Sequence, residues 1–435
     1  MDEQEVEDSP AKPAPATQPA TFREVFGVSE YRFLFTAAVL SWIGDYFAKV
    51  AVAVLIFSDT GSVLLSAAGF AVSYLPWVAG GPVLAALAER YPYRRVMILC
   101  DVVRFVLVAL MALPGLPLVA LLLLLFASSL LTPPFQAARS AMVAQILTGD
   151  RYVVGLSVQN MVGQAAQVAG YALGGVTAAI DGRVALLINA ATFGASALLL
   201  WRGVRPRPVG TAAAPRRSLL KETGDGIRLV FGHRVMRPIA LVVFSMVAIQ
   251  IVPEGLAAAW AAELGGDSRT AGLLMAAMPI GNVIGAFIVS RMTPSRRLKL
   301  IKPVLLMSPL FLVPALADPP AVIVFLLGVC TGVTATVIVP LNGLFVTVLP
   351  EGFRARAFGV MQGGMQLSFA AAVLAAGVLA ESFPVPVVVG VWGVCGLLVM
   401  AVAVRTWPRD AVIDAEVARA ADLNSPSSQA GHDPR

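Results

Sequence analysis

Long apolar segments separated by short polar ones recur along almost the whole chain. Segments of about 20 residues at 1.5 Å each are long enough to cross a hydrocarbon core of about 30 Å as helices. Continuous apolar runs such as 116–131 lack the alternation that is typical of barrel strands, so the pattern predicts helices. The twelve expected spans are 32–57, 64–88, 96–113, 117–138, 153–180, 184–201, 238–262, 270–290, 303–317, 320–347, 357–380 and 385–404.

Composition agrees with this pattern. Of the 435 residues, 58% are hydrophobic and only 13% are charged, whereas a soluble protein of this length needs a far more charged surface. The three cysteines stand singly in apolar segments, without the spacing of a metal site or a disulfide framework. The expected fold class is an all-α membrane protein with twelve transmembrane helices.

The distribution of basic residues predicts the orientation of the chain. With twelve spans both termini lie on one side, and 28 of the 32 Lys and Arg residues fall on that side. Arg183 and Arg269 lie on the other side, and Lys49 and Arg104 lie within spans. The positive-inside rule then places both termini in the cytoplasm, in a bacterial inner membrane. The basic residues behind the net charge of +6 are explained by the orientation of the chain in the membrane, so they do not indicate binding of nucleic acid. The expected partners are the lipid bilayer and a small-molecule substrate, and no nucleic acid.

The spans divide into two sets of six around a long polar connection. The expected organisation is a partly disordered cytoplasmic tail at 1–30, a six-helix bundle at 31–201, a cytoplasmic linker with a surface helix at 202–237, a second bundle at 238–407 and a cytoplasmic tail at 408–435. The two halves resemble each other weakly: "SYLPWVAGGPV" leads to "ERYPYRR" in the first, and "AAMPIGNVIGAF" leads to "SRMTPSRR" in the second. Internal repeats of this kind are typical of transporters whose substrate site lies between the repeats.

The loop after the second span carries a family resemblance. The sequence "ALAERYPYRRVMILCDVVR" resembles the G-x-L-A-D-R-x-G-R-R loop of the major facilitator superfamily, with Glu89, Arg90, Arg94 and Arg95 matching its acid and bases. The resemblance covers 31–407 and implies two pseudo-symmetric six-helix bundles. The stretches "RRVMILCDVVR" and "PPFQAARSAMVAQIL" resemble the branch of drug, macrolide and siderophore exporters that includes the enterobactin exporters.

Two departures from that branch concern coupling. Many proton-coupled drug exporters carry an Arg in the middle of the fourth helix, whereas residues 119–131 contain none. Their fifth helix often reads G-x-x-x-G-P-x-x-G-G, whereas this chain reads "GQAAQVAGYALGG", with Tyr171 in the Pro position.

Besides Asp101 and Arg104 of the third span, three charged residues lie within apolar spans. Asp45 falls near the midplane of the first span, with Lys49 one turn later and Glu254 in the seventh. A central Asp or Lys costs roughly 2.5–3.5 kcal/mol to insert, and an i,i+4 pair returns only about 0.2–0.5 kcal/mol on an exposed helix. Asp45 and Lys49 should therefore face the bundle interior. Asp45 and Glu254 are the proton-coupling candidates. The alternatives are an ion pair of Asp45 and Lys49 that only fixes packing, a Lys49 that snorkels outward, and a Glu254 solvated near the outer mouth.

Two larger sets of polar residues follow from the resemblance and from helical spacing. The cavity candidates lie on helices that line the central cavity in this fold, although amides in membrane helices also serve as interhelical contacts. They are Tyr46, Lys49, Tyr74, Trp77, Asn160, Gln164, Gln167, Gln250, Asn282, Asn342, Gln362 and Gln366. The second set is expected to form a charge network at the cytoplasmic gate: Glu89, Arg90, Arg94, Arg95, Asp101, Arg104 and Arg139.

No enzyme chemistry is indicated. His233 and His432 lie outside the spans, and no Gly-rich phosphate loop followed by Lys and Ser or Thr is present. We expect a monomeric secondary transporter without cofactor or metal, which exports a small amphipathic compound by alternating access and is driven by the proton gradient. The alternatives are uptake, translocation of lipid or lysolipid, and a transport-inactive scaffold or sensor.

Overall fold

The computed structural model describes residues 21–79, 91–207, 219–349 and 354–408, together with residues 412, 415, 416 and 418. Helices occupy the described part of all twelve predicted spans, and no strand occurs in these ranges, which confirms the predicted all-α fold. Eight helical segments are long and apolar enough to cross a membrane, and Val63–Trp77 and Ile301–Ala317 are shorter apolar helices. Most of the two predicted tails lies outside the described residues.

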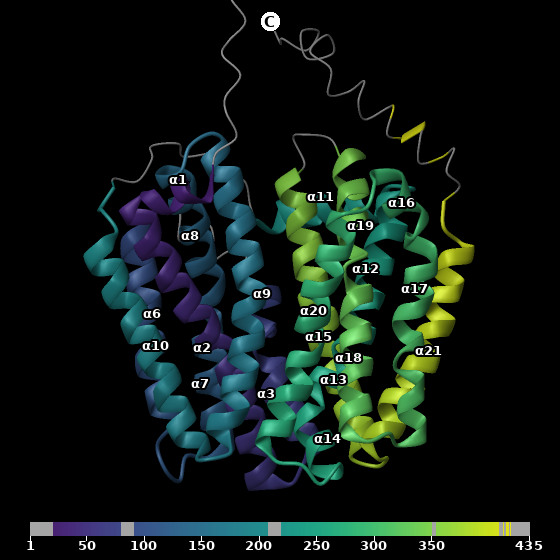
Figure 1. Cartoon of the computed structure of the whole chain (residues 1–435), viewed down its shortest axis with the longest axis horizontal. Coiled ribbons are helices and arrows are strands. Elements are labelled where there is room, and N and C mark those ends of the chain that lie inside the picture. The colour runs from purple at the N-terminus through teal and green to yellow at the C-terminus, as the bar shows by residue number, and fades with distance from the viewer. Residues whose placement is uncertain are drawn as a thin grey trace, which may run out of the picture.

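The first half of the chain forms one set of helices, seen on the left of Figure 1. The helices are α1 (Phe22–Gly27), α2 (Ser29–Thr60), α3 (Val63–Val72), α4 (Leu75–Ala79), α6 (Tyr93–Met111), α7 (Leu118–Leu130), α8 (Thr132–Ile146), α9 (Asp150–Ala178) and α10 (Gly182–Gly203). Within this half α2 packs against α9 and α10, and α6 packs against α10. A separate helix, α11 (Leu219–Gly232), follows in the connection between the halves and packs against the second half.

The second half repeats the arrangement on the right of Figure 1. Its helices are α12 (Met236–Gln250), α13 (Val252–Gly255), α14 (Ala257–Glu263), α15 (Ser268–Ser290), α16 (Pro294–Lys299), α17 (Ile301–Leu310), the 3-10 helix η1 (Val313–Ala317), α18 (Ala321–Ala335), α19 (Ile338–Thr347), α20 (Arg354–Ala380) and α21 (Val385–Arg405). We call the two ends of the molecule the α11 end and the α14 end, after the helices that mark them in Figure 1.

Several spans are interrupted, and proline lies near most of the interruptions. The seventh span breaks at Ile251 and Leu256, on either side of Pro253, which lacks the N–H that a continuous helix needs. The second span breaks between α3 and α4, just before Pro76, and the fourth between α7 and α8, just before Pro133. The first span, α2, runs for 32 residues without a break.

Large apolar side chains cover the outside of both halves. Leu99, Leu123, Leu187, Phe287, Leu326 and Leu398 are all more than half exposed. These side chains belong to helices of both halves, and a soluble protein would bury most of them. The pattern matches a bundle whose outer surface contacts lipid tails.

The two halves touch mainly near the α14 end, through α9 against α15 and α3 against α20. At the first crossing the helices approach backbone to backbone: a Cβ added at Gly272 would lie 2.6 Å from the Tyr171 carbonyl oxygen. Beyond the second crossing, Glu381 accepts hydrogen bonds from the Ser62 hydroxyl at 2.6 Å and from the Leu64 N–H at 2.8 Å. These contacts hold the halves together at the α14 end.

Candidate functional site

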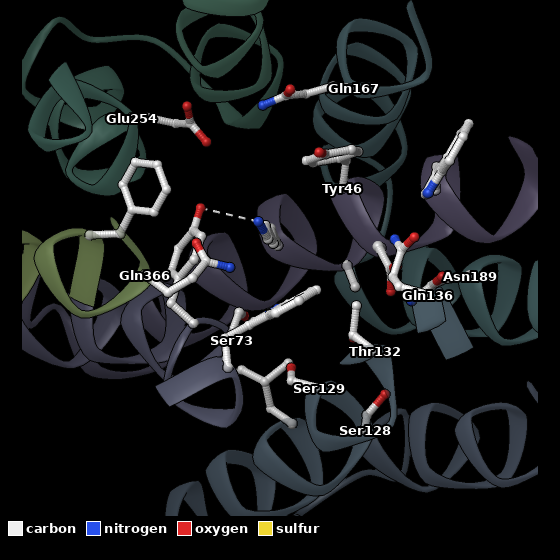
Figure 2. A pocket seen from close by; sticks show the side chains of 18 of the residues that line it. Tyr46, Ser73, Ser128, Ser129, Thr132, Gln136, Gln167, Asn189, Glu254 and Gln366 are labelled. Carbon is white, nitrogen blue, oxygen red and sulfur yellow. Dashed lines mark hydrogen bonds between the residues drawn. The ribbon is translucent and has the colours of Figure 1, made fainter. Parts of the chain in front are cut away.

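A cavity of about 350 Å³ lies between the two halves. Figure 2 shows its polar lining, with Glu254 and Gln167 on one side and Thr132, Gln136 and Asn189 on the other. Nine of the residues chosen from the sequence line this cavity: Asp45, Tyr46, Lys49, Tyr74, Trp77, Gln167, Glu254, Asn282 and Gln366. Polar groups that converge in a cavity between repeats are the expected form of a transporter's substrate site.

The remaining cavity candidates lie elsewhere. Asn160, Asn342 and Gln362 are exposed and lie outside the cavity lining, and the partly buried Gln164 is also absent from it. Gln250 is buried and donates a hydrogen bond to the Ser308 hydroxyl at 2.7 Å, next to a smaller cavity that shares Glu254. Helical spacing placed these residues on polar faces but could not show how far along each helix the cavity extends.

Asp45 lies halfway along α2 and meets an arginine from another helix. Its Oδ2 lies 3.8 Å from Nη1 of Arg104, whose side chain is only 1% exposed. Arg104 also donates hydrogen bonds to the Thr132 hydroxyl and, at 3.5 Å, to Ser41. The recorded ion-pair partner of Asp45 is therefore Arg104 on α6, and the expected pairing of Asp45 with Lys49 is not found among the described residues.

Lys49 has a largely aromatic environment. Its Nζ donates to the Tyr74 hydroxyl at 3.1 Å and lies 4.4 Å from the Tyr74 ring centroid, 5.1 Å from that of Tyr46 and 5.6 Å from that of Phe70. Rings at these distances attract a desolvated ammonium group through their quadrupoles. Tyr74 in turn packs on Phe369 of the other half, with centroids 5.1 Å apart. Lys49 thus stays inside the bundle and does not snorkel to an end.

Glu254 is buried on α13 and accepts a hydrogen bond from the Tyr171 hydroxyl on α9. This bond crosses from one half to the other. Tyr171 is fully buried and packs edge-to-face on Tyr46, with centroids 5.2 Å apart. The residue in the usual Pro position of the fifth helix therefore links the carboxylate of the second half to the aromatic groups around Lys49.

The described members of the expected gate network do not form one cluster. Glu89 and Arg90 lie outside the described residues. Arg94 donates to the backbone carbonyl groups of Leu200 and Trp201, and Arg95 is exposed. Helix α6 begins at Tyr93, so residues 101 and 104 lie two to three turns inside the bundle rather than at its end.

The inner members of that set bind to other helices instead. Asp101 accepts a hydrogen bond from the Ser196 hydroxyl at 2.5 Å. Arg139 donates to Gln136, and its guanidinium lies 4.3 Å from the ring centroid of Trp42. Arg104 contacts Asp45 and Thr132 of the cavity lining. Arg139 contacts Gln136 and Trp42 of the same lining, and the role of both arginines at a gate stays a prediction.

Sequence reasoning missed part of the polar lining. Ser128 and Ser129 on α7, Thr132 and Gln136 on α8, and Asn189 on α10 all line the cavity. The sequence feature that could have identified them is that each is a polar residue in an otherwise apolar segment. No group of three or more His, Cys, Asp or Glu side chains that could hold a metal ion occurs in the described ranges.

Comparisons with known proteins agree with this architecture. A sequence model described as Major Facilitator Superfamily matches residues 34–253 and 254–430. The structure of the nucleoside transporter NupG superposes with a TM-score of 0.67 at 13% identity, covering 87% of this chain and 100% of that one. The inward-open xylose transporter XylE from E. coli gives 0.65 at 12% identity, with 87% and 96% covered.

A bacterial homologue of the iron transporter ferroportin, in an inward-facing state, gives a TM-score of 0.65 at 14% identity, with 89% of this chain and 99% of that one covered. At these identities the similarity shows the fold alone. The search of curated proteins found no match.

Proposed function

This chain belongs to the major facilitator superfamily and is a multi-pass membrane transporter, and from that premise we propose that it exports a small amphipathic compound in exchange for protons. The resemblance of "PPFQAARSAMVAQIL" to the drug, macrolide and siderophore exporters supports export. The cavity between the halves supports a substrate of modest size with both aromatic and polar contacts.

The observation that carries the coupling proposal is the hydrogen bond between Tyr171 and Glu254, because it joins the two halves through an acid. A hydroxyl binds a carboxylate about twice as strongly as it binds a neutral acceptor. When Glu254 takes up a proton, the bond to Tyr171 weakens, and the contact that favours closure of the α14 end weakens with it. Protonation of this one carboxyl would thereby be linked to the movement of the two halves.

Asp45 supplies the second carboxylate at the cavity. Its charge is balanced by Arg104 at 3.8 Å, whereas Glu254 has no cation within ion-pair distance among the described residues and interacts with Lys49 only at longer range. Protonation of Glu254 therefore removes a negative charge that is less well compensated than the charge of Asp45. We assign Glu254 as the main proton carrier and Asp45 as the group whose ion pair with Arg104 positions α2 against α6.

The orientation of the transporter follows from its basic residues. Most of the Lys and Arg residues fall in connections at the α11 end, so we place that end in the cytoplasm of a bacterial inner membrane. The halves meet at the α14 end, so the structure is the state in which the outer end is closed. Glu254 would exchange its proton with the cytoplasm in this state and with the outside after the outer end opens.

The test uses purified protein in liposomes with an imposed pH gradient and a panel of anionic, cationic and neutral amphipathic compounds. Wild-type protein should couple movement of at least one compound to proton flux, which a trapped pH-sensitive dye reports. Glu254→Gln should abolish proton-driven accumulation while exchange without a gradient persists. Glu24→Gln, the same change at an exposed position of the α11 end, is the control and should behave as wild type.

Proton-driven transport by Glu254→Gln at the wild-type level would refute this assignment. If no compound moves and no proton flux is seen with wild type, the exporter proposal itself is wrong. Accumulation in the opposite direction would favour uptake instead.

A further inference from the structure

Three side chains on one wall of the cavity, all from the first half, have hydrogen-bond donors without a partner among the described residues. They are Thr132 and Gln136, one turn apart on α8, and Asn189 on α10. Figure 2 shows them on the side of the pocket away from Glu254. Their acceptor atoms are largely engaged from behind, so the groups left for a ligand are donors.

Arginine fixes the direction of two of these side chains. Arg139 donates to Oε1 of Gln136, and because a guanidinium has no acceptor the Gln136 amide must turn its NH₂ group the other way. Arg104 donates to the Thr132 hydroxyl oxygen, which leaves the hydroxyl hydrogen free to donate. Neither remaining donor has a recorded partner among the described residues.

Asn189 supplies the independent observation. Its side chain is fully buried and lines the cavity, yet its Nδ2 has no hydrogen-bond partner in the part of the chain that the structure describes. Its Oδ1 lies 3.5 Å from the Thr192 hydroxyl. A buried amide nitrogen without a partner costs free energy unless a ligand or solvent satisfies it.

One guanidinium behind this wall, that of Arg139, has no acidic partner among the described residues. Arg139 is 8% exposed, has no carboxylate within ion-pair distance among the described residues, and leaves Nε and Nη1 without partners. Arg104 is balanced by Asp45 and lies three residues from Asp101 on α6. Donors backed by an uncompensated guanidinium stabilise a negatively charged acceptor.

We propose that Thr132, Gln136 and Asn189 form a subsite that binds an anionic oxygen group, a carboxylate or a phosphate monoester, of the transported molecule. This inference rests on the proposed transport function and gives the chemical class of its substrate. The neighbouring aromatic rings, Trp42 and Phe193, would hold the apolar body of an amphipathic anion.

The test measures binding to the full-length protein in detergent by quenching of tryptophan fluorescence. The probes share one aromatic body: naphthalene-2-carboxylate, 2-naphthyl phosphate and the cation (2-naphthyl)methylammonium. We expect wild type to bind at least one anion about tenfold or more tightly than the cation, which is about 1.4 kcal/mol or more. Whether the carboxylate or the phosphate binds more tightly identifies which of the two the subsite takes.

The decisive variant is Gln136→Glu, because one carboxylate oxygen keeps the contact with Arg139 while the other now presents an acceptor to the ligand. It should lose the preference for anions. Gln362→Glu, the same change at an exposed position outside the cavity, should keep it. If the melting temperature shows that Gln136→Glu does not fold, Gln136→Met, which removes the donor without adding charge, should weaken binding of the anions alone.

An unchanged anion preference in both folded Gln136 variants, a wild-type preference for the cation, or no binding of any probe at millimolar concentration would overturn the subsite. The transport assay separates this result from the proposed function. Selective binding that depends on Gln136, without any proton-coupled transport, would refute the function and leave the subsite standing. Proton-coupled transport with unchanged selectivity in Gln136→Glu would refute the subsite alone.

Discussion

Replacement of Gly175 by alanine is expected to favour opening of the α14 end. Gly175 lies on α9 where this helix crosses α15 of the other half. A Cβ added there would lie 2.6 Å from the Ser268 carbonyl oxygen and 2.8 Å from the Gly272 Cα. Both are backbone atoms, so no side-chain rotation can relieve the clash and the two helices must separate.

The size of the effect follows from these distances. Ordinary van der Waals contact begins near 3.4 Å, so the crossing must widen by roughly 0.8 Å. Overpacking of this kind costs about 1–3 kcal/mol. That cost falls on the state in which the halves touch at the α14 end, so the ratio of the two states should shift by about 5- to 150-fold toward the state open at that end.

Spin labels can measure this shift. Cysteines would be introduced at Arg183 and Ser382, exposed positions of opposite halves at the α14 end, after replacement of the three native cysteines. Pulsed electron spin resonance should show a longer-distance population in Gly175→Ala. Gly163→Ala on the same helix is the control, because its Cβ would lie 3.8 Å from the nearest atom of Trp42, an ordinary contact. An unchanged distance distribution in folded Gly175→Ala would refute the reasoning.

Two further predictions concern charged contacts. The hydrogen bonds from Ser62 and Leu64 hold the pKa of Glu381 below its usual 4.5. They therefore stabilise the closed α14 end while Glu381 is ionised. This contribution is lost as the pH falls from 4.5 through the lowered pKa of Glu381. The distances between the same spin labels should therefore lengthen in acid. Glu381→Gln cannot titrate at this position and should lack this pH dependence. Equal acid responses in both proteins would show that the Glu381 contact does not stabilise the closed end. Arg104→Met should destabilise the protein by about 1–3 kcal/mol, because Asp45, Thr132 and Ser41 lose their partner while Asp45 keeps some solvent contact at the cavity, and the melting temperature should fall. Adding Asp45→Asn should restore part of that loss, whereas no recovery would show that the ion pair is unimportant.

The spans and the central position of Asp45 could be predicted because both depend on distance along a single helix. Hydropathy fixes where a span begins and ends to within a few residues, and the rise per residue then fixes depth. The break in the seventh span was also visible, since Pro253 cannot donate to a helical hydrogen bond.

The partners of the buried charges could not be predicted, because they depend on how helices pack. The i,i+4 spacing brought Lys49 to the face of Asp45, but it could not show that Arg104 of α6 points at the same carboxylate. Once Arg104 occupies that position, Lys49 turns toward Tyr74. Gln136 was missed for a related reason: its orientation is set by Arg139 on the next turn, and the sequence alone does not show which side of α8 meets the cavity.

The first and seventh spans occupy equivalent places in the two halves but differ in stiffness. The first span, α2, is one continuous helix, so bending it would break regular backbone hydrogen bonds along its length. Its counterpart in the second half is divided at Ile251 and Leu256, where the angle between segments can change at little cost. The first span therefore moves as one rigid rod, whereas the seventh contains a hinge beside the carboxyl group of Glu254. A small molecule bound in the smaller cavity that Gln250 and Pro253 line would stall the cycle at this hinge without filling the substrate cavity.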